Sequence, residues 1–403
     1  MRYFIEAGYV SLNKKGEELC GDRVETIYHD DTMTTVLADG LGSGVKANIL
    51  STLTSKIIST MMSSGMAIQD CVETIAQTLP ICKIRQVAYS TFTILQIRTD
   101  GSAYMVQFDN PLCVLLRNGK HVEYPVEVNV IDGKTIYESH MKVELGDVFV
   151  MFSDGVPHAG IGITMNLGWQ QENVVRHLEE QYDKNDSAKS TAAKLADTAK
   201  ALYLGEPGDD TTVAVMKVRE RQNVSIMFGP PSDPKDDEQV VKQFLAEDGI
   251  KIVSGGTTSK IVSSYLGQPV QTCLDYFDPK IPPIGKMKGV DLVTEGVLTL
   301  GHVMELSNMI VSQTNTDLSW LQKKDGASLI AQYLFEQATD VSFYAGRAIN
   351  PAHQNPNLPI QFHIKMQMVN ELAECLKKMG KQIKVSNLEQ ERQRLTRLFR
   401  NHG

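Results

Sequence analysis

Thr34-Thr35-Val36-Leu37-Ala38-Asp39-Gly40-Leu41-Gly42-Ser43-Gly44 is the stretch on which the fold of this chain depends. It begins as a run of apolar and β-branched residues and ends in an Asp-Gly pair followed by two more glycines. Residues 45–62 are apolar at helical spacing and contain neither proline nor glycine. The pattern predicts a strand, a tight turn and a helix, with the Asp39 carboxylate at the end of the strand. The glycines allow another group to approach the backbone closely.

The composition is that of an ordinary globular protein. The chain has 403 residues, 22% of them charged, and a formal net charge of −8. This length predicts two or three domains, and the acidic balance argues against a nucleic-acid-binding protein. The sequence shows no apolar run long enough to span a bilayer and no signal peptide, and its six cysteines form no C-x-x-C pair. We therefore expect a cytoplasmic protein with reduced thiols.

Residues 1–220 contain many short β-type segments, with helical patterns in separate blocks. This arrangement predicts an α+β sandwich of antiparallel strands rather than βαβ repeats. The predicted strands include residues 3–12, 24–28, 34–40, 89–97, 103–108, 112–116, 148–152 and 213–218, and the predicted helices are 46–63, 67–78, 170–181 and 188–204.

A charged break at residues 219–223 separates a second pattern from the first. Strands and helices alternate after it, which predicts a small parallel α/β unit. The chain is mainly helical from residue 327 and ends in a charged amphipathic helix at 389–400. We therefore divide the chain into domains at 1–220 and 224–403.

Four acidic turns recur in the first domain, each at the end of an apolar strand or just before one. Antiparallel strands can bring such ends to one rim, where the carboxylates would repel one another unless cations neutralise them. Oxygen ligands without His or Cys favour Mg²⁺ or Mn²⁺, and two ions sharing one carboxylate form a hydrolytic site. Any single Asp-Gly pair is as readily an ordinary turn, so the prediction depends on the recurrence. The turns are Gly21-Asp22, Asp39-Gly40, Ser153-Asp154-Gly155 and Gly208-Asp209-Asp210.

The set of turns resembles the signature of the SpoIIE-like branch of the metal-dependent type 2C serine/threonine protein phosphatases. Residues 37–44 look like the "DGMGxG" element of that branch, with Leu41 in place of the usual Met. Residues 152–156 look like its "SDG" element, residues 208–213 like its terminal "DD-x-T" element, and Gly21-Asp22 fits its early "GD" element. The resemblance covers residues 1–220, just over half of the chain.

This resemblance implies a fold, a reaction and a set of ligands. The fold is an αββα sandwich of two antiparallel sheets with helices outside. The reaction is hydrolysis of phosphoserine or phosphothreonine by water activated at two Mn²⁺ or Mg²⁺ ions. The implied catalytic acids are Asp22, Asp39, Asp154 and Asp209. In the implied metal set, Asp39 bridges both ions and the Gly40 carbonyl binds one of them. Asp154 and Asp209 bind the other ion, and Asp22 acts near the first ion through water. Asp210 also belongs to this set, but the resemblance leaves open whether it binds metal directly.

Three further features of the first domain bear on the resemblance. The helices after Asp39 correspond to an element of this branch that can switch the metal site. Many eukaryotic members carry a phosphate-binding Arg before the first acid, whereas Arg23 follows it here, so we expect metal to hold most of the phosphate. His158, four residues after Asp154, is a candidate proton donor, although we favour a loop histidine without a role.

The second half contains a glycine and hydroxyl cluster between a predicted strand and helix. Gly255, Gly256, Thr257 and Thr258 could hold a phosphate or carboxylate at the start of that helix, and an ordinary capped turn is an equally good interpretation. Asp291 and Glu295 could line the same pocket. We expect this half to sense a small-molecule ligand or to select the substrate.

The sequence leaves three functions open. The first is a metal-dependent phosphatase acting on a phosphorylated partner protein. The second is a non-catalytic scaffold with a phosphatase fold, and the third is a phosphatase of a small phosphorylated metabolite. The intact acidic set argues against the scaffold. A homodimer is plausible, and the substrate is not named by the sequence.

Overall fold

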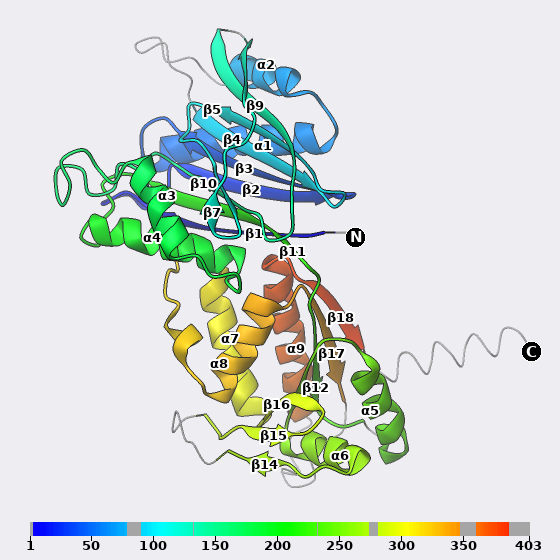
Figure 1. Cartoon of the computed structure of the whole chain (residues 1–403). Helices are drawn as coiled ribbons and strands as arrows, with labels where there is room; N and C mark the ends of the chain where they lie inside the picture. Colours follow the sequence, from blue (N-terminus) through cyan, green and yellow to red (C-terminus); the bar gives the residue numbers. More distant parts are fainter. Residues whose placement is uncertain are drawn as a thin grey trace, which may run out of the picture. The chain divides into compact units, whose positions relative to one another are not determined.

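The computed structural model describes residues 3–78, 90–131, 133–231, 233–273, 281–346 and 360–386. The chain forms two compact units, which Figure 1 shows in sequence colours. The first comprises Met1–Glu220 and Gln313–Asp317, and the second comprises Arg221–Ser312 and Leu318–Gly403. Within the described part of the chain, no helix has both the length and the apolar character needed to cross a membrane.

The first unit is built on two antiparallel sheets. The five-stranded sheet has the order β1-β11-β10-β6-β7, and the six-stranded sheet has the order β2-β3-β4-β5-β9-β8. The first sheet contains β1 (Phe4–Leu12), β6 (Val114–Arg117), β7 (Lys120–His121), β10 (Val148–Phe152) and β11 (Thr211–Arg219). The second contains β2 (Asp22–His29), β3 (Thr32–Gly40), β4 (Ser90–Arg98), β5 (Ser102–Phe108), β8 (Glu127–Ile131) and β9 (Lys134–Lys142).

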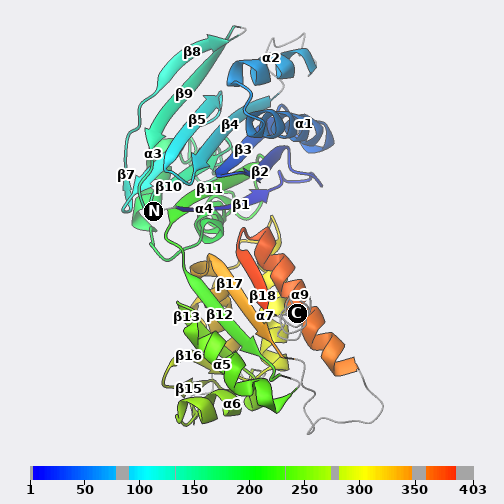
Figure 2. The ribbon, with the colours of Figure 1, turned by 90° about the vertical axis from the view of Figure 1, so that its right-hand side faces the viewer.

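Helices cover the outer faces of both sheets, as Figures 1 and 2 show. One core lies between the sheets, where Leu37 of β3 belongs to the same buried cluster as Phe149 of β10. A second core lies outside the six-stranded sheet, where Val36 packs with Ile58. The predicted α+β sandwich is therefore confirmed. The helices of this unit are α1 (Gly44–Ser63), α2 (Ile68–Thr78), α3 (Gln171–Glu180) and α4 (Ala188–Leu202).

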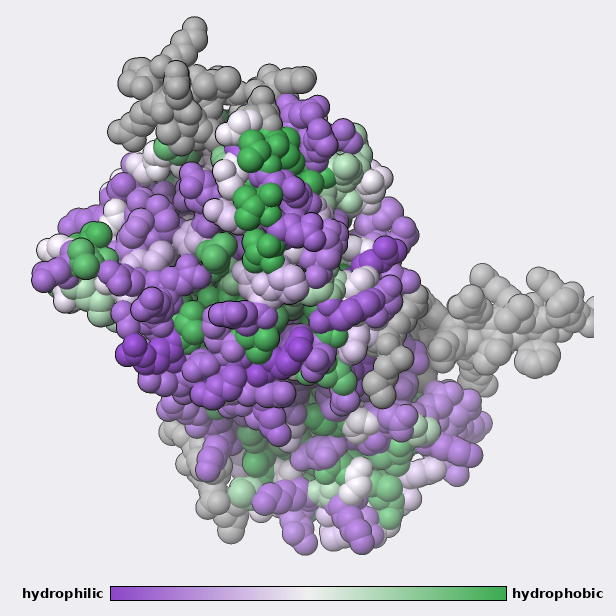
Figure 3. All heavy atoms as spheres, turned by 45° about the horizontal axis from the view of Figure 1, so that its top comes forward, coloured by the Kyte–Doolittle hydropathy of each residue, from purple (hydrophilic) through white to green (hydrophobic). Residues whose placement is uncertain are grey.

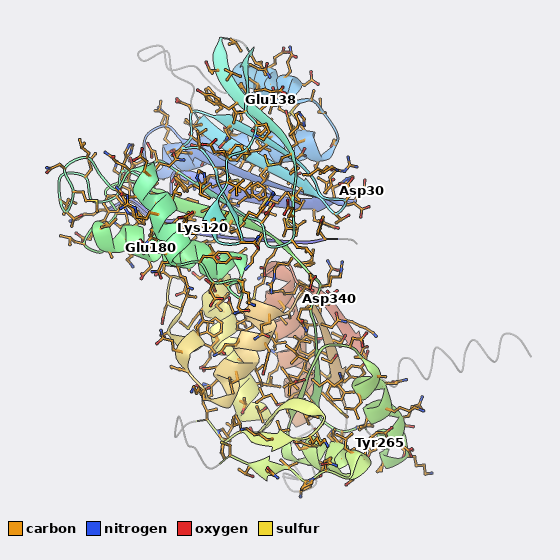
Figure 4. All side chains as sticks on the ribbon, viewed as in Figure 1. Asp30, Lys120, Glu138, Glu180, Tyr265 and Asp340 are labelled. Atoms are coloured by element: carbon orange, nitrogen blue, oxygen red, sulfur yellow. The ribbon has the colours of Figure 1, made fainter. Side chains whose placement is uncertain are left out.

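The sequence analysis did not predict the β8–β9 hairpin. Its strands are rich in polar residues because β8 is a sheet edge and most of its side chains are exposed. Glu138 of β9, labelled in Figure 4, accepts a hydrogen bond of 2.5 Å from the Tyr104 hydroxyl on β5. A strand held by such local polar contacts lacks the apolar run by which a strand is recognised in sequence.

The second unit is a seven-stranded, mainly parallel sheet of order β14-β15-β16-β13-β12-β17-β18. Helices cover both faces, because one buried cluster includes α7, α8 and α9 and another includes α5 and α6. The strands are β12 (Asn223–Phe228), β13 (Ile250–Ser254), β14 (Gln271–Thr272), β15 (Gly285–Met287), β16 (Val290–Thr294), β17 (Asp340–Ala345) and β18 (Gln382–Ser386). The α-helices are α5 (Asp237–Ala246), α6 (Gly256–Leu266), α7 (Val297–Val311), α8 (Gly326–Ala331) and α9 (Ile360–Lys378). The 3₁₀ helices are η1 (Pro234–Asp236) and η2 (Ser319–Gln322), and η3 (Gln332–Gln337) is a π-helix.

The C-terminal region is less helical than its sequence suggests. Helices α8 and α9 are present, but β17 and β18 alternate with them and extend the parallel sheet beyond β12. Asp340, at the start of β17 and labelled in Figure 4, accepts a hydrogen bond of 2.6 Å from the Arg221 guanidinium. The helix expected at residues 389–400 lies outside the described residues.

Candidate metal centre

Two of the predicted acids face each other across the β2–β3 ladder. Asp22 is the register partner of Asp39, and directly opposite residues of an antiparallel pair share one face of the sheet. The ladder continues into the turn, where the Gly40 amide donates to the Gly21 carbonyl at 3.2 Å. The Asp39 carbonyl accepts a bond of 2.8 Å from the Ser90 hydroxyl. Both strand ends are therefore fixed by backbone and side-chain bonds.

A short hydrogen-bond relay holds Asp22. The Thr212 amide donates to the Ser153 hydroxyl oxygen at 2.9 Å, and that hydroxyl donates to Asp22 Oδ2 at 2.7 Å. The other carboxylate oxygen, Oδ1, is buried and has no hydrogen-bond partner among the described residues. Burial raises the pKa of Asp22 to about 7, even though the bonds from Ser153 and Thr212 act in the opposite direction. An unsatisfied acceptor oxygen therefore lies beside Asp39.

The surroundings of Asp39 show that the acidic turns converge. Burial is the largest cause that raises the pKa of this carboxyl group to about 9. The next causes are the charges of four other carboxylates, those of Asp22, Asp154, Asp209 and Asp210. Acids from three separate strand ends thus act on Asp39 electrostatically.

Asp154 and Asp209 are more open to solvent than Asp22. Asp154 Oδ2 lies 3.7 Å from His158 Nδ1, and Asp209 Oδ1 lies 3.4 Å from Lys14 Nζ. Burial and the charge of Asp209 raise the pKa of Asp154. Asp22 is therefore the buried member of the four, Asp39, Asp154 and Asp209 are partly exposed, and Asp154 and Asp209 each have a basic side chain near them.

Asp210 accepts a hydrogen bond from the loop that follows β1. Its Oδ1 accepts a bond of 3.0 Å from the Lys14 amide. Its Oδ2 lies only 2.7 Å from the place that a Cβ atom on Gly21 would take. Asp210 therefore holds two parts of the loop between β1 and β2, and its direct binding of metal stays a prediction.

The chemistry of these residues suits a hard divalent cation. Carboxylate and carbonyl oxygens are the ligands that Mg²⁺ and Mn²⁺ prefer, and the orphaned Asp22 Oδ1 is an acceptor that a cation or its water would satisfy. No three His, Cys, Asp or Glu side chains within the described ranges already lie as close as metal ligands do. The individual ligand roles stay predictions.

A cavity of about 250 Å³ adjoins Asp22. Its lining includes Arg23, Asn48 and Gln313, and Arg23 Nε is buried there without a hydrogen-bond partner among the described residues. The Gln313 carbonyl accepts a bond of 2.9 Å from the Ser11 amide on β1. The Gln313–Asp317 segment is thus part of the first unit, and it supplies one wall of this cavity.

The glycine turn of the second unit joins β13 to α6. Gly255 has φ +115°, a conformation that favours glycine, and its amide donates to the Thr294 carbonyl at 2.9 Å. The Thr258 hydroxyl accepts a bond of 3.1 Å from the Gly229 amide, so one expected anion ligand already has a partner. A Cβ on Gly256 would meet nothing within 4 Å. Anion binding by Gly255, Gly256, Thr257 and Thr258 stays a prediction.

Asp291 does not lie near this turn, which corrects the sequence-based placement. It lies at the start of β16, where its carboxylate accepts a bond of 2.7 Å from the Lys251 amide. The turn follows the opposite ends of the parallel strands. Glu295 does follow β16, and it accepts a bond of 3.2 Å from the Leu298 amide at the start of α7.

Comparison with known families bears on the first unit. Residues 29–219 match the family described as "Stage II sporulation protein E (SpoIIE)". The resemblance to the SpoIIE-like type 2C phosphatases is confirmed over these residues. The matched segment of this SpoIIE-like domain includes Asp39, Asp154 and Asp209, and it begins after Asp22.

Three of the solved structures that resemble this SpoIIE-like domain come from two bacteria. The phosphatase domain of the cell fate determinant SpoIIE from Bacillus subtilis has 18% identity, a TM-score of 0.43, and coverage of 54% of this chain and 93% of its own. A longer piece of that protein, with a fragment of its regulatory domain, has 19% identity, a TM-score of 0.47, and coverage of 54% and 64%. The RsbU and RsbW domains of a Mycobacterium tuberculosis protein have 15% identity, a TM-score of 0.44, and coverage of 60% and 67%. No curated protein sequence matches the chain.

Proposed function

We propose that residues 1–220 form a Mn²⁺- or Mg²⁺-dependent phosphatase that hydrolyses phosphoserine or phosphothreonine on a partner protein. The observation that carries this proposal is the convergence of Asp22, Asp39, Asp154 and Asp209, with Asp22 and Asp39 opposite each other and one oxygen of Asp22 unsatisfied. The family match over residues 29–219 supports it.

Each residue has a proposed task in this reaction. Asp39 would hold the shared position between two ions, assisted by the Gly40 carbonyl, and Asp154 and Asp209 would hold the more exposed ion. Asp22 would accept a proton or a hydrogen bond from water near the first ion, because its Oδ1 is buried and has no hydrogen-bond partner among the described residues. Two bound divalent ions supply an activated water and neutralise charge on the phosphoryl oxygens. Ser153 keeps Asp22 in place through the bond of 2.7 Å.

The first test is hydrolysis of p-nitrophenyl phosphate in the presence of Mn²⁺. We expect turnover by the wild type and none by Asp39→Asn. Asp30→Asn is the matched control, because Asp30 lies in the turn at the other end of the same β2–β3 hairpin and its side chain is exposed (Figure 4). Inactivity of the wild type, or equal activity of both variants, would contradict the proposal.

A non-catalytic scaffold is the alternative from a different class. Calorimetric titration with Mn²⁺ separates the two, because a scaffold has no reason to bind metal at the acidic rim. We expect Mn²⁺ binding by the wild type and a large loss of affinity in Asp154→Asn. Heat of binding that is the same in both proteins would place the metal elsewhere and favour the scaffold.

We also propose a cytoplasmic protein whose residues 224–403 bind an anionic small molecule or select the substrate. Support comes from the Gly255–Gly256 turn, because it follows a parallel strand and begins α6, where backbone amides favour anions. Titration with inorganic phosphate tests the anion, with Gly256→Asp as the variant that should weaken binding by adding a negative charge. Equal phosphate affinities of the wild type and Gly256→Asp would show that the turn does not bind the anion.

We also propose that the chain forms a homodimer, and light scattering tests this.

A further inference from the structure

The loop between β10 and α3 exposes large apolar side chains close to the acidic centre. Ile161, Ile163 and Leu167 are 48%, 54% and 72% exposed. Residues 160–168 contain no charged side chain. In Figure 3, hydrophobic residues form a patch at the left-hand margin, where this loop projects in Figure 1. We call Ile161, Ile163 and Leu167 the apolar loop residues.

The backbone of this loop is internally bonded. The Gly160 carbonyl accepts bonds of 3.0, 3.0 and 2.9 Å from the amides of Ile163, Thr164 and Met165. The Thr164 hydroxyl donates to the Leu202 carbonyl at 2.8 Å, which fastens the loop to the end of α4. Gly160 has φ +78°, and a Cβ there would lie 2.2 Å from the Thr164 hydroxyl oxygen. The apolar side chains are therefore exposed on a loop whose backbone is held by hydrogen bonds.

Contacts at both ends of the loop connect it to the Asp154–Gly155 turn of the acidic centre. On one side, the Ile161 amide donates to the carbonyl of His158 at 3.1 Å, and His158 Nδ1 lies 3.7 Å from Asp154. On the other side, Leu202 precedes Tyr203, whose hydroxyl donates to the Gly155 carbonyl at 2.8 Å. Hydrogen bonds thus connect the apolar loop to the Asp154–Gly155 turn.

We propose that Ile161, Ile163 and Leu167 bind apolar side chains next to the phosphorylated residue of a protein substrate. The proposal rests on the proposed phosphatase function and distinguishes a protein substrate from a small metabolite. A phosphorylated metabolite reaches the metal site without covering three exposed aliphatic side chains, whereas a polypeptide entering the same site has flanking residues to cover them. Because the loop is uncharged, it selects apolar flanks rather than charged ones.

The expected effect follows from the transfer of apolar surface out of water. Covering one such side chain on binding changes affinity by roughly tenfold, and the three loop residues would not contribute equally. Hydrolysis of a small phosphate ester, which does not reach the loop, should be unchanged when the loop residues become polar. The selective loss is the signature of docking, because a general folding defect would reduce both reactions.

The test compares the full-length wild type with Ile161→Ser/Ile163→Ser/Leu167→Ser. The matched control is Val128→Ser/Val130→Ser, because these β8 side chains are 61% and 70% exposed. The probes are two synthetic phosphoserine peptides, one flanked by Leu and Val and one by Ser and Gly, together with p-nitrophenyl phosphate. Hydrolysis is measured with Mn²⁺, and binding of fluorescein-labelled peptides is measured by anisotropy.

We expect the wild type and the β8 variant to prefer the apolar-flanked peptide by at least about tenfold in kcat/KM and in affinity. The loop variant should lose that preference while it hydrolyses p-nitrophenyl phosphate at the wild-type rate. Equal peptide preference in the wild type and the loop variant would overturn the inference and leave the phosphatase function intact. Loss of dimerisation in the loop variant without a change in peptide preference would overturn it too, because the occupant would be a second copy. If no probe is hydrolysed, the phosphatase function fails, and anisotropy still decides whether the loop binds apolar flanks.

Discussion

Asp22 and Asp39 lie directly opposite each other on one face of the β2–β3 pair, and Asp22 is buried. Two like charges in such positions destabilise a sheet unless one is protonated or a cation lies between them. Burial is the largest cause that raises the pKa values of both carboxyl groups, and the charge of Asp22 raises the pKa of Asp39 further. One oxygen of Asp22 has no hydrogen-bond partner in the described part of the chain. If this pair binds the proposed cation, protein stability and metal binding should be linked here.

Asp39→Asn should abolish phosphatase activity and leave the metal-free protein folded. Removing the proposed shared ligand should lower kcat by at least about 10²–10³-fold. At pH 8 the folded wild type must keep Asp39 protonated, and the neutral Asn side chain removes that cost, so the metal-free variant should be at least as stable as the wild type. Activity and urea denaturation in EDTA measure the two effects. A variant that is inactive because it is unfolded would contradict this account.

The metal-free protein should lose stability as the pH rises. The pKa of Asp39 is raised from 3.8 to about 9, so the folded state keeps a proton that the unfolded chain has lost between these values. This contribution is fully present below the ordinary pKa and declines as the pH approaches 9. Melting temperatures in EDTA from pH 5 to pH 9 should therefore fall, and they should fall less steeply in Asp39→Asn. The increase in melting temperature on adding Mn²⁺ should grow with pH, and a constant increase would contradict the link.

Ser153→Ala should weaken metal binding through Asp22. The variant removes the 2.7 Å bond to Asp22 and leaves the Thr212 amide without its 2.9 Å acceptor. We expect a metal affinity 10–100-fold lower and a stability loss of about 1–3 kcal/mol. Steady-state kinetics over a series of Mn²⁺ concentrations separate weakened metal binding from a purely structural effect. If only metal binding is weakened, kcat should recover substantially at saturating Mn²⁺. Reduced kcat with unchanged metal dependence would mean that Ser153 does not act through Asp22.

The sequence was sufficient to predict the elements around the acidic turns. Apolar strands end at Asp39 and Asp154, and these local patterns predict β3 and β10 closely. The sandwich followed from the spacing of strands and helices. The convergence of the acids depended on their recurrence, because a single Asp-Gly pair contains no information about the strand that will lie beside it.

Contacts between residues far apart in the chain could not be predicted from the local sequence pattern. Lys14 lies 3.4 Å from Asp209 although 195 positions separate them, and no periodicity marks either residue as the partner of the other. The strands β9 and β17 were missed for a different reason. Polar residues interrupt the apolar run of β9, and β17 lies between η3 and α9 in a region that the sequence analysis took as mainly helical.

Gly40→Ala should disturb the site by breaking the close contact between the end of β3 and α1. A Cβ at this position would lie 2.1 Å from the Ala47 carbonyl oxygen, which is backbone and cannot be relieved by a rotamer change. Either α1 or the end of β3 must move, so we expect a loss of about 1–3 kcal/mol in stability and a displaced Asp39. The matched control is Gly301→Ala in α7, where a Cβ would meet nothing within 4 Å and helix propensity favours alanine by about 1 kcal/mol. Urea denaturation should therefore show opposite signs for the two variants. Activity measured well below the denaturation midpoint should fall in Gly40→Ala alone, and wild-type activity there would show that the position of Asp39 does not depend on its contact with α1.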